Sequence, residues 1–212
     1  MTSLRVATSP RPPLLSEDSG PGLRWVLFLQ GCARPCTRVC LNPHYLDPAG
    51  GVAVSISALR LLVAQIGAGT WGPVEGVTVL GGEPTDQAAG LLPLLGHARA
   101  AGLSVMLYSG HTREWFDGVP EAAALLPLVD LLVDGPFVER LADATLRWRG
   151  STNQRILRLT DRYTAEDIAL GMERRGITLT RPSAGAGILS GMQDREAVVG
   201  LLSEGKLRVN PS

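Results

Sequence analysis

Short apolar runs alternate with amphipathic segments along most of the chain. Four runs are short, apolar and rich in β-prone residues, and they predict buried strands at about 23–30, 77–80, 103–108 and 128–133. Two longer segments carry apolar residues at helical spacing and predict helices at about 55–66 and 85–101, with a shorter one at 121–126. Pro93 predicts a kink or a break in the second helix. Strands that alternate with helices indicate an α/β protein with a parallel sheet, as a layer or as a partial (β/α) barrel.

The two ends of the chain depart from this alternation. Residues 1–22 are polar and proline-bearing, and they predict a mobile N-terminal arm that ends in the turn Gly20-Pro21-Gly22. Residues 161–212 predict a small α+β extension, with helices at 164–175 and 194–203 and a strand at 177–180 that pairs with 188–189. The expected organisation is therefore an arm (1–22), a partial-barrel core of parallel strands (23–160) and a C-terminal extension (161–212).

Composition and charge exclude several classes of protein. The chain has 212 residues, of which 45% are apolar, so it can bury a full core. It carries 20 basic and 20 acidic residues, a balance that gives no electrostatic footprint for nucleic acid. Its apolar runs are too short to span a membrane, and its first residues lack the apolar stretch of a signal peptide. We expect a cytoplasmic protein without nucleic-acid or membrane partners.

All three cysteines lie in one loop directly after the first predicted strand. Cys32, Cys36 and Cys40 have the spacing Cys-x3-Cys-x3-Cys. Three thiolates on one loop can hold three irons of a 4Fe–4S cluster and leave the fourth iron open to a substrate. His44 offers an alternative, because together with the three thiolates it could complete a closed, structural Cys3His zinc site. The loop alone leaves both alternatives open, although the odd cysteine count argues against a disulfide framework.

Polar and glycine-rich motifs follow the other predicted strands. They are Gly81-Gly82-Glu83-Pro84, Ser109-Gly110-His111-Thr112 and Asp134-Gly135-Pro136-Phe137. In parallel α/β folds the ligand sits at the carboxyl ends of the strands, so these motifs are expected to face it. Glycines allow close backbone approach, and a carboxylate pairs with a cation. Each motif taken alone is also compatible with an ordinary turn.

The cysteine loop and the Gly81-Gly82-Glu83-Pro84 turn together resemble the radical S-adenosylmethionine (SAM) superfamily. Three further stretches, 107–112, 130–137 and 148–155, sharpen the match to the activating proteins of anaerobic ribonucleotide reductase. The resemblance spans roughly residues 19–157, with its motifs in the right order. One feature departs from the family pattern, which is usually Cys-x3-Cys-x2-Cys, because this chain has one more residue between Cys36 and Cys40.

The resemblance implies a set of roles for individual residues. Cys32, Cys36 and Cys40 would be the cluster ligands, and His44 would then be a loop or outer residue. The SAM contacts would come from the following residues: Gly81, Gly82 and Glu83 at the methionine ammonium, Pro84 fixing their turn, Ser109 at the carboxylate or ribose, and Asp134 at a ribose hydroxyl or a bound cation. Asn153 and Gln154 belong to the family motif but receive no physical role, and His111 is expected to be a surface or loop histidine.

The resemblance also implies an oxygen-sensitive mechanism. An external one-electron donor of the flavodoxin or ferredoxin type would reduce the cluster, and SAM would be cleaved to methionine and a 5′-deoxyadenosyl radical. The chemistry belongs to the cofactor, so no catalytic side chain is expected beyond the cluster and SAM site.

Three functions compete. The first is an activase that generates a glycyl radical on a large partner enzyme, and the motif match favours it. The second is a radical SAM enzyme that modifies a small molecule or peptide in a biosynthetic pathway, which would suit the altered cysteine spacing and the unmatched residues 161–212. The third is a non-catalytic Cys3His zinc or iron–sulfur binding module.

Overall fold

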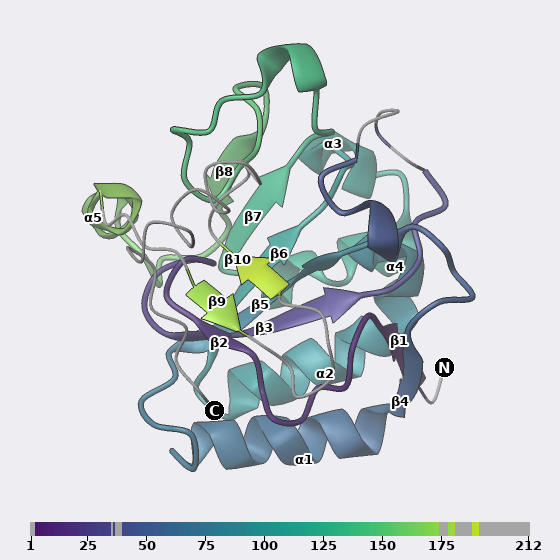
Figure 1. The fold of residues 1–212 in the computed structure, drawn as a ribbon. Coiled ribbons are helices and arrows are strands. Elements are labelled where there is room, and N and C mark those ends of the chain that lie inside the picture. The colour runs from purple at the N-terminus through teal and green to yellow at the C-terminus, as the bar shows by residue number, and fades with distance from the viewer. Residues whose placement is uncertain (1–2, 35, 37–39, 174–177, 181–187, 191–212) are drawn as a thin grey trace, which may run out of the picture.

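Four parallel strands form the centre of the fold in the computed structural model, which describes residues 3–34, 36, 40–173, 178–180 and 188–190. They are β3 (Arg24–Leu29), β5 (Gly76–Gly81), β6 (Ser104–Tyr108) and β7 (Leu131–Asp134), paired in that order (Figure 1). These strands confirm the four apolar runs of the sequence. Because all four run in one direction, their carboxyl ends lie at the same edge of the sheet.

Antiparallel strands complete an eight-stranded sheet of order β4-β1-β3-β5-β6-β7-β8, with β2 paired to β3. The added strands are β1 (Ser3–Val6), β2 (Leu15–Ser16), β4 (Val52–Ser55) and β8 (Arg155–Arg158). The expectation of an all-parallel sheet is therefore corrected to a mixed α/β sheet that is parallel at its centre. The sheet is open in the described part of the chain, and its interpretation as a partial barrel stays a prediction.

Residues 3–22 do not form the expected mobile arm. Strand β1 lies between β3 and β4, and its side chains Leu4 and Val6 are fully buried. The Gln87 side chain binds this strand as a neighbouring strand would: its Oε1 accepts from Arg5 N at 2.8 Å and its Nε2 donates to Arg5 O at 3.0 Å. Two apolar residues in a polar segment are too weak a pattern to predict a strand. Strand β1 forms because it pairs with residues that are distant in the sequence.

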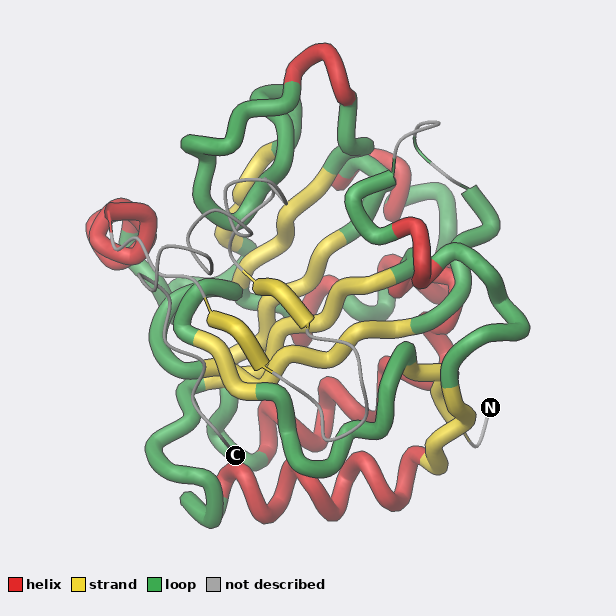
Figure 2. Tube along the Cα trace, viewed as in Figure 1, coloured by secondary structure: helices red, strands yellow, loops and turns green. Residues whose placement is uncertain are grey.

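One face of the sheet is covered by the two long helices α1 (Ile56–Gly67) and α2 (Ala88–Ala100), which pack on each other (Figures 1 and 2). The α1 helix begins at Ser55, whose Oγ accepts a hydrogen bond from Ala58 N at 3.2 Å. The main core lies between these helices and the sheet; its members include Leu27, Val79, Leu107, Leu59, Leu62, Leu91 and Leu95.

Helix α2 continues across Pro93, so the helix does not break there, and the alternative of a kink stays a prediction. Pro93 is exposed, whereas Leu91, Leu94 and Leu95 are buried in the core and hold the helix on both sides of it. A proline on the solvent side leaves the freed carbonyl group near water, where its hydrogen bond can be replaced.

The opposite face of the sheet carries a second, smaller core. Met106, Leu131 and Val133 pack there with Trp148 and Tyr163, and α5 (Ala165–Glu173) adds Ile168. The start of α5 is a reciprocal cap, because Thr164 Oγ1 accepts from Asp167 N at 3.1 Å and Asp167 Oδ2 accepts from Thr164 N at 2.8 Å.

The remaining described elements are short. The helices α3 (Arg113–Phe116) and α4 (Pro120–Ala123) follow β6, and single 3-10 turns occupy Pro43–Tyr45, Pro84–Gln87, Leu126–Leu128 and Glu139–Leu141. Strands β9 (Thr178–Thr180) and β10 (Ile188–Ser190) pair antiparallel, which confirms the predicted pairing in the C-terminal part. The helix predicted at 194–203 falls outside the described residues, and the domain boundary at residue 160 stays a prediction.

Candidate functional site

The loops that follow β3, β5, β6 and β7 meet at the carboxyl edge of the sheet. The chain that leaves β3 into the cysteine loop lies beyond the arrowhead of that strand, and its described residues are blue in Figure 1. Its Gly31 O accepts from Glu83 N at 2.9 Å, which joins the first two loops. On the other side, Gly135 N donates to His111 O at 3.0 Å and joins the last two. The structure thus gathers the predicted motifs at one edge.

Backbone hydrogen bonds hold the cysteine loop at its root. Gly31 N donates to Tyr45 O at 2.8 Å, and Cys32 N donates to Leu46 O at 3.1 Å. One residue further on, Ala33 N donates to the Asp86 carboxylate at 2.8 Å. The loop therefore leaves the sheet in a fixed direction, between the returning chain at 45–46 and the turn after β5.

Each cysteine sulfur receives a backbone N–H group. Asn42 N donates to Cys40 Sγ at 3.4 Å. Burial raises the pKa of the Cys36 thiol, and a hydrogen bond from the backbone of Phe137 opposes that rise. Burial likewise raises the pKa of Cys32, opposed by the backbone of Arg34. N–H groups directed at sulfur favour the thiolate, the form that binds metal.

Gly110 makes room for the central cysteine. A Cβ atom at Gly110 would lie 2.6 Å from Cys36 Sγ, closer than two such atoms approach. The loop after β6 is therefore fitted to the cysteine loop, and any side chain at residue 110 would displace the thiol.

The described side chains form no ready-made site for a single metal ion, and the ligand set of the cysteine loop stays a prediction. Among the described residues, which include the three cysteines and His44, no three His, Cys, Asp or Glu side chains converge enough to hold one metal ion. A closed Cys3His zinc site requires that convergence. A cube of irons separates its ligands more widely, and three thiols on one loop provide its ligand set with one iron left over.

The glycines after β5 bring two loops together. A Cβ at Gly82 would lie 1.9 Å from Gly31 O, and Gly81 has a φ of 117°, a value that favours glycine. Gly82 N also donates to Leu29 O at 2.8 Å. The close approach predicted for this turn thus occurs against the cysteine loop, and its contact with SAM stays a prediction. Pro84 begins the 3-10 turn that follows.

Glu83 is buried and holds four donors. Its Oε1 accepts from Thr85 N at 3.0 Å, from Thr85 Oγ1 at 2.7 Å and from Ser109 Oγ at 3.0 Å. Its Oε2 accepts from Gly110 N at 2.8 Å. The carboxylate therefore links the ends of β5 and β6, and the structure brings two predicted site residues, Glu83 and Ser109, into direct contact.

Asp134 has different neighbours. Its fully buried carboxylate accepts from Arg113 N at 2.6 Å and pairs with Arg155 through two nitrogens, one of them Nε at 2.9 Å from Oδ1. Arg155 also contacts Glu114 at 2.9 Å. Asp134 thus fastens α3 and β8 to the end of β7, and the contacts described for it are to protein groups.

The structure supplies the role that the sequence could not give to Asn153 and Gln154. Gln154 Oε1 accepts from Gly150 N at 2.8 Å and from Ser151 N at 3.2 Å, while its Nε2 donates to Gly135 O at 3.2 Å. Asn153 Nδ2 donates to Pro136 O at 2.8 Å. The two amides fold their own turn and hold it against the 134–137 turn, which carries the backbone donor to Cys36.

His111 lies in a loop, as predicted, but it is not on the surface. Only 8% of the residue is exposed, and its ring stacks on Trp115 with centroids 3.6 Å apart. Its Nδ1 lies 3.2 Å from Arg34 Nη1 in the cysteine loop. The four-residue spacing from His111 to Trp115 was a visible signal for the stack, whereas the contact with Arg34 had none.

Three consecutive residues before β8 carry unpaired donors. Within the described chain, the buried side-chain nitrogens and oxygens without a hydrogen bond are Arg147 Nη1, Trp148 Nε1 and Arg149 Nε. Trp148 also has a φ of 62°, which is strained for a bulky residue. The unpaired donors and the strained backbone indicate that packing against the rest of the protein, and not the hydrogen bonds of these side chains, fixes the conformation of this segment.

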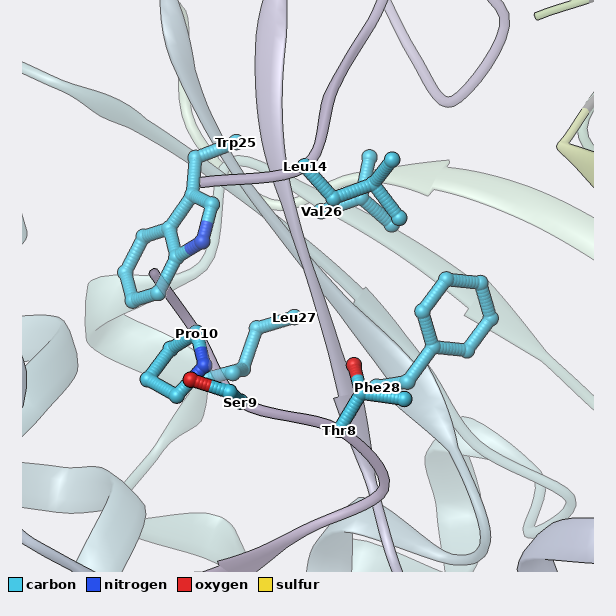
Figure 3. Close-up of a pocket in the computed structure, with 8 residues that line it drawn as sticks. All are labelled: Thr8, Ser9, Pro10, Leu14, Trp25, Val26, Leu27 and Phe28. Atoms are coloured by element: carbon cyan, nitrogen blue, oxygen red, sulfur yellow. The ribbon is translucent and has the colours of Figure 1, made fainter. Parts of the chain in front are cut away.

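A small cavity lies away from these loops, between residues 8–14 and β3 (Figure 3). Its volume is about 10 Å³, which is room for about one water molecule. Its lining combines Trp25, Val26, Leu27 and Phe28 with residues of the preceding segment. This cavity is too small to be the binding site for a nucleoside.

Comparison with known sequences agrees with the geometry of the carboxyl edge. The sequence profile of the 4Fe-4S single cluster domain matches residues 19–157, and the chain belongs to that family. A protein of Vibrio cholerae is 32% identical over 146 residues, which cover 67% of this chain and 92% of that protein. Relatives from Haemophilus influenzae (29% over 144 residues, 66% and 90% covered) and phage T4 (28% over 148 residues, 68% and 88% covered) are similar.

Each of these relatives is named anaerobic ribonucleoside-triphosphate reductase-activating protein. The chain is a member of this radical SAM-like activase family. The profile match ends at residue 157, so residues 161–212 lie beyond it. None of the helices in the described ranges combines the length and apolar character needed to cross a bilayer.

Proposed function

We propose that this chain holds a 4Fe–4S cluster through Cys32, Cys36 and Cys40, cleaves SAM reductively, and so generates a glycyl radical on a partner ribonucleotide reductase. The main support is that the cysteine loop and the Gly81-Gly82-Glu83-Pro84 turn lie together at the carboxyl edge of the sheet. There the Glu83 N donates a hydrogen bond to Gly31 O at 2.9 Å. Membership of the activase family supports the choice of partner.

The cluster, when bound, supplies the electron that splits SAM into methionine and a 5′-deoxyadenosyl radical. The chain's own residues set its surroundings. The three thiols bind as thiolates, a form that the backbone N–H groups of Arg34, Asn42 and Phe137 favour. Gly110 leaves space beside the central thiol, and the Gly81-Gly82 turn allows the loop after β5 to approach the backbone of Gly31 at the start of the cysteine loop.

Glu83 keeps capacity for the SAM ammonium group. A carboxylate offers about four lone pairs, two on each oxygen. In Glu83 three donors crowd Oε1, whereas Oε2 accepts only from Gly110 N among the described contacts. Glu83 would hold the ammonium through Oε2, with the Gly81 and Gly82 backbone and Pro84 shaping the turn and Ser109 supporting the carboxylate. Asp134 would serve a ribose hydroxyl of SAM or a bound cation, with Arg155 orienting its carboxylate.

The exposed side of the cysteine loop is the expected approach for redox partners. Although its sulfur lies against Gly110, residue Cys36 as a whole is exposed, and Leu41, next to Cys40, is 40% exposed. An electron donor of the flavodoxin or ferredoxin type could reach the cluster from there, because transfer requires proximity to the metal rather than contact with SAM. The partner reductase must reach the SAM side of the same edge.

The test is anaerobic reconstitution with iron and sulfide, followed by dithionite and SAM. We expect 5′-deoxyadenosine from the wild type and none from Cys36→Ala. Addition of the reductase should then give the electron paramagnetic resonance (EPR) doublet of a glycyl radical. One bound zinc with no nucleoside product would overturn the enzymatic function. Nucleoside without a glycyl radical would instead favour the small-molecule or peptide alternative raised by the cysteine spacing.

A further inference from the structure

His111 is a buried imidazole that the proposed reaction does not use. The reaction needs no proton transfer, yet this ring is 8% exposed and lies one residue from Gly110, which contacts Cys36. Its backbone N donates to Ser109 Oγ at 3.0 Å, so the main chain at this position is fixed as well. A buried polar ring in a well-fixed loop beside the thiols calls for a specific explanation.

A row of contacts connects this ring to the core on one side and to the cysteine loop on the other. Phe116 is fully buried and meets the Trp115 ring edge-on, with centroids 5.5 Å apart. Trp115 stacks on His111 with an angle of 12° between the rings. His111 Nδ1 then meets Arg34 Nη1 at 3.2 Å. The position of the Arg34 guanidinium is thereby tied to the hydrophobic core.

The chemistry of this last contact requires a neutral imidazole. Burial lowers the pKa of His111, which keeps the ring uncharged at neutral pH. A neutral ring with its proton on Nε2 accepts at Nδ1, and a guanidinium can only donate. The ring therefore accepts a hydrogen bond from Arg34 and adds no charge of its own.

Arg34 is a cation among anions. Arg34 lies between Cys32 and Cys36 in the cysteine loop, and its guanidinium reaches His111, next to the Gly110 that donates to the Glu83 carboxylate. Asp86 also lies close, since it accepts from Ala33 N at 2.8 Å. A positive charge near a cluster stabilises its reduced form, which is one electron more negative than the oxidised form.

We propose that His111 is a positioning residue that holds the Arg34 guanidinium beside the cysteine loop, where its charge makes the bound cluster easier to reduce. The proposal rests on the proposed function for the presence of the cluster. It goes beyond that function by assigning control of the reduction potential to a side-chain pair outside the ligand set.

The test measures the midpoint potential of the cluster by anaerobic redox titration, followed by EPR without SAM. Arg34→Gln removes the charge, and His111→Phe keeps an aromatic ring on Trp115 but removes the acceptor. Each should lower the potential, with a reduced fraction about tenfold smaller at a fixed potential, which corresponds to 59 mV for one electron. The double variant should match Arg34→Gln alone, because both changes remove the same interaction.

Two further variants separate positioning from general damage. His111→Asn retains an acceptor where Nδ1 lies and should restore most of the wild-type potential. Arg60→Gln makes the same charge change on the exposed side of α1 and should leave the potential unchanged. High salt should reduce the Arg34→Gln shift, because Arg34 is exposed and its charge is screened.

Several results would overturn the proposal. They are a wild-type potential in His111→Phe, additive shifts in the double variant, or no recovery in His111→Asn when its cluster content is normal. If the wild type holds no iron, the proposed function fails. The Arg34–His111 contact can still be tested by urea unfolding of the metal-free wild type, the two single variants Arg34→Gln and His111→Phe, and the double variant. Changes in the urea unfolding midpoint that do not add in the double variant would support the Arg34–His111 contact, and additive changes would refute it.

Discussion

Replacement of Glu83 offers the sharpest test of how the site is built. If this carboxylate served only to bind SAM, its loss would weaken SAM binding and leave the protein otherwise intact. In the structure it is 4% exposed and accepts four hydrogen bonds from the loops after β5 and β6. We therefore expect that replacing it will destabilise the fold and also disturb the cysteine loop.

The magnitude follows from the donors left behind. Each buried donor without a partner costs about 1–3 kcal/mol. Glu83→Ala orphans four donors, but water and relaxation recover part of the loss, and single substitutions rarely exceed about 5 kcal/mol. We expect a loss of about 3–5 kcal/mol in the free energy of unfolding. Glu83→Gln keeps one oxygen acceptor and turns an amide NH2 toward Gly110 N, so its loss should be smaller, about 1–3 kcal/mol.

The assay is urea unfolding of the metal-free chain, followed by circular dichroism and linear extrapolation, alongside iron content after reconstitution. Iron content should fall in both variants, because Glu83 fixes Gly110 and Gly110 contacts Cys36. The control is Glu121→Gln, on the exposed surface of α4. Wild-type stability and iron content in Glu83→Gln, with only SAM affinity reduced, would refute this reasoning.

Three other predictions follow from single contacts. Gly110→Ala should lower the iron bound per chain, because its Cβ would lie 2.6 Å from Cys36 Sγ. The control Gly118→Ala, whose Cβ would have its nearest neighbour at 3.6 Å, should bind as much iron as the wild type. Equal iron contents in the two variants would contradict this prediction. The hydrogen bond from Arg155 lowers the pKa of Glu114 from 4.5 to about 2, so the stability from this pair is complete above pH 4.5 and is lost as pH falls toward 2. NMR titration should show that pKa return toward 4.5 in Arg155→Gln, and an unchanged value would exclude Arg155 as its cause. Trp148→Phe should change the free energy of unfolding by less than about 1 kcal/mol, because relief of the unpaired indole N–H offsets the smaller ring; a loss above about 2 kcal/mol would show that the N–H has a partner.

The central strands could be predicted from the sequence because each is a continuous apolar run buried on both faces. The same logic placed the polar motifs at one edge, since parallel strands share their carboxyl ends. The N-terminal strand was missed because Leu4 and Val6 are its only buried residues. Their position depends on β3, β4 and the side chain of Gln87, and no local pattern records these partners.

The sequence predicted which residues gather at the carboxyl edge of the sheet, but not how they contact one another. The motifs identified Glu83 and Ser109, but the hydrogen bond between them joins residues 26 positions apart, and local spacing says nothing of such a pair. Asp134 ends a strand and its role toward a ligand stays a prediction, whereas its contact with Arg155, which lies opposite it in the β7–β8 register, was not predicted. Antiparallel β8 was itself unpredicted, because Ile156 and Leu157 between two arginines form too short a pattern.

The packing of Cys36 against Gly110 and Phe137 has a consequence for biogenesis. Both neighbours are synthesised long after the cysteines, and the turn that carries Phe137 is fastened in part by Asn153 and Gln154. A nascent chain that has released only its cysteine loop from the ribosome lacks most of the walls around that loop. Loading of the metal centre should therefore follow completion of the domain, and truncation before residue 154 should yield a chain that binds little iron on reconstitution.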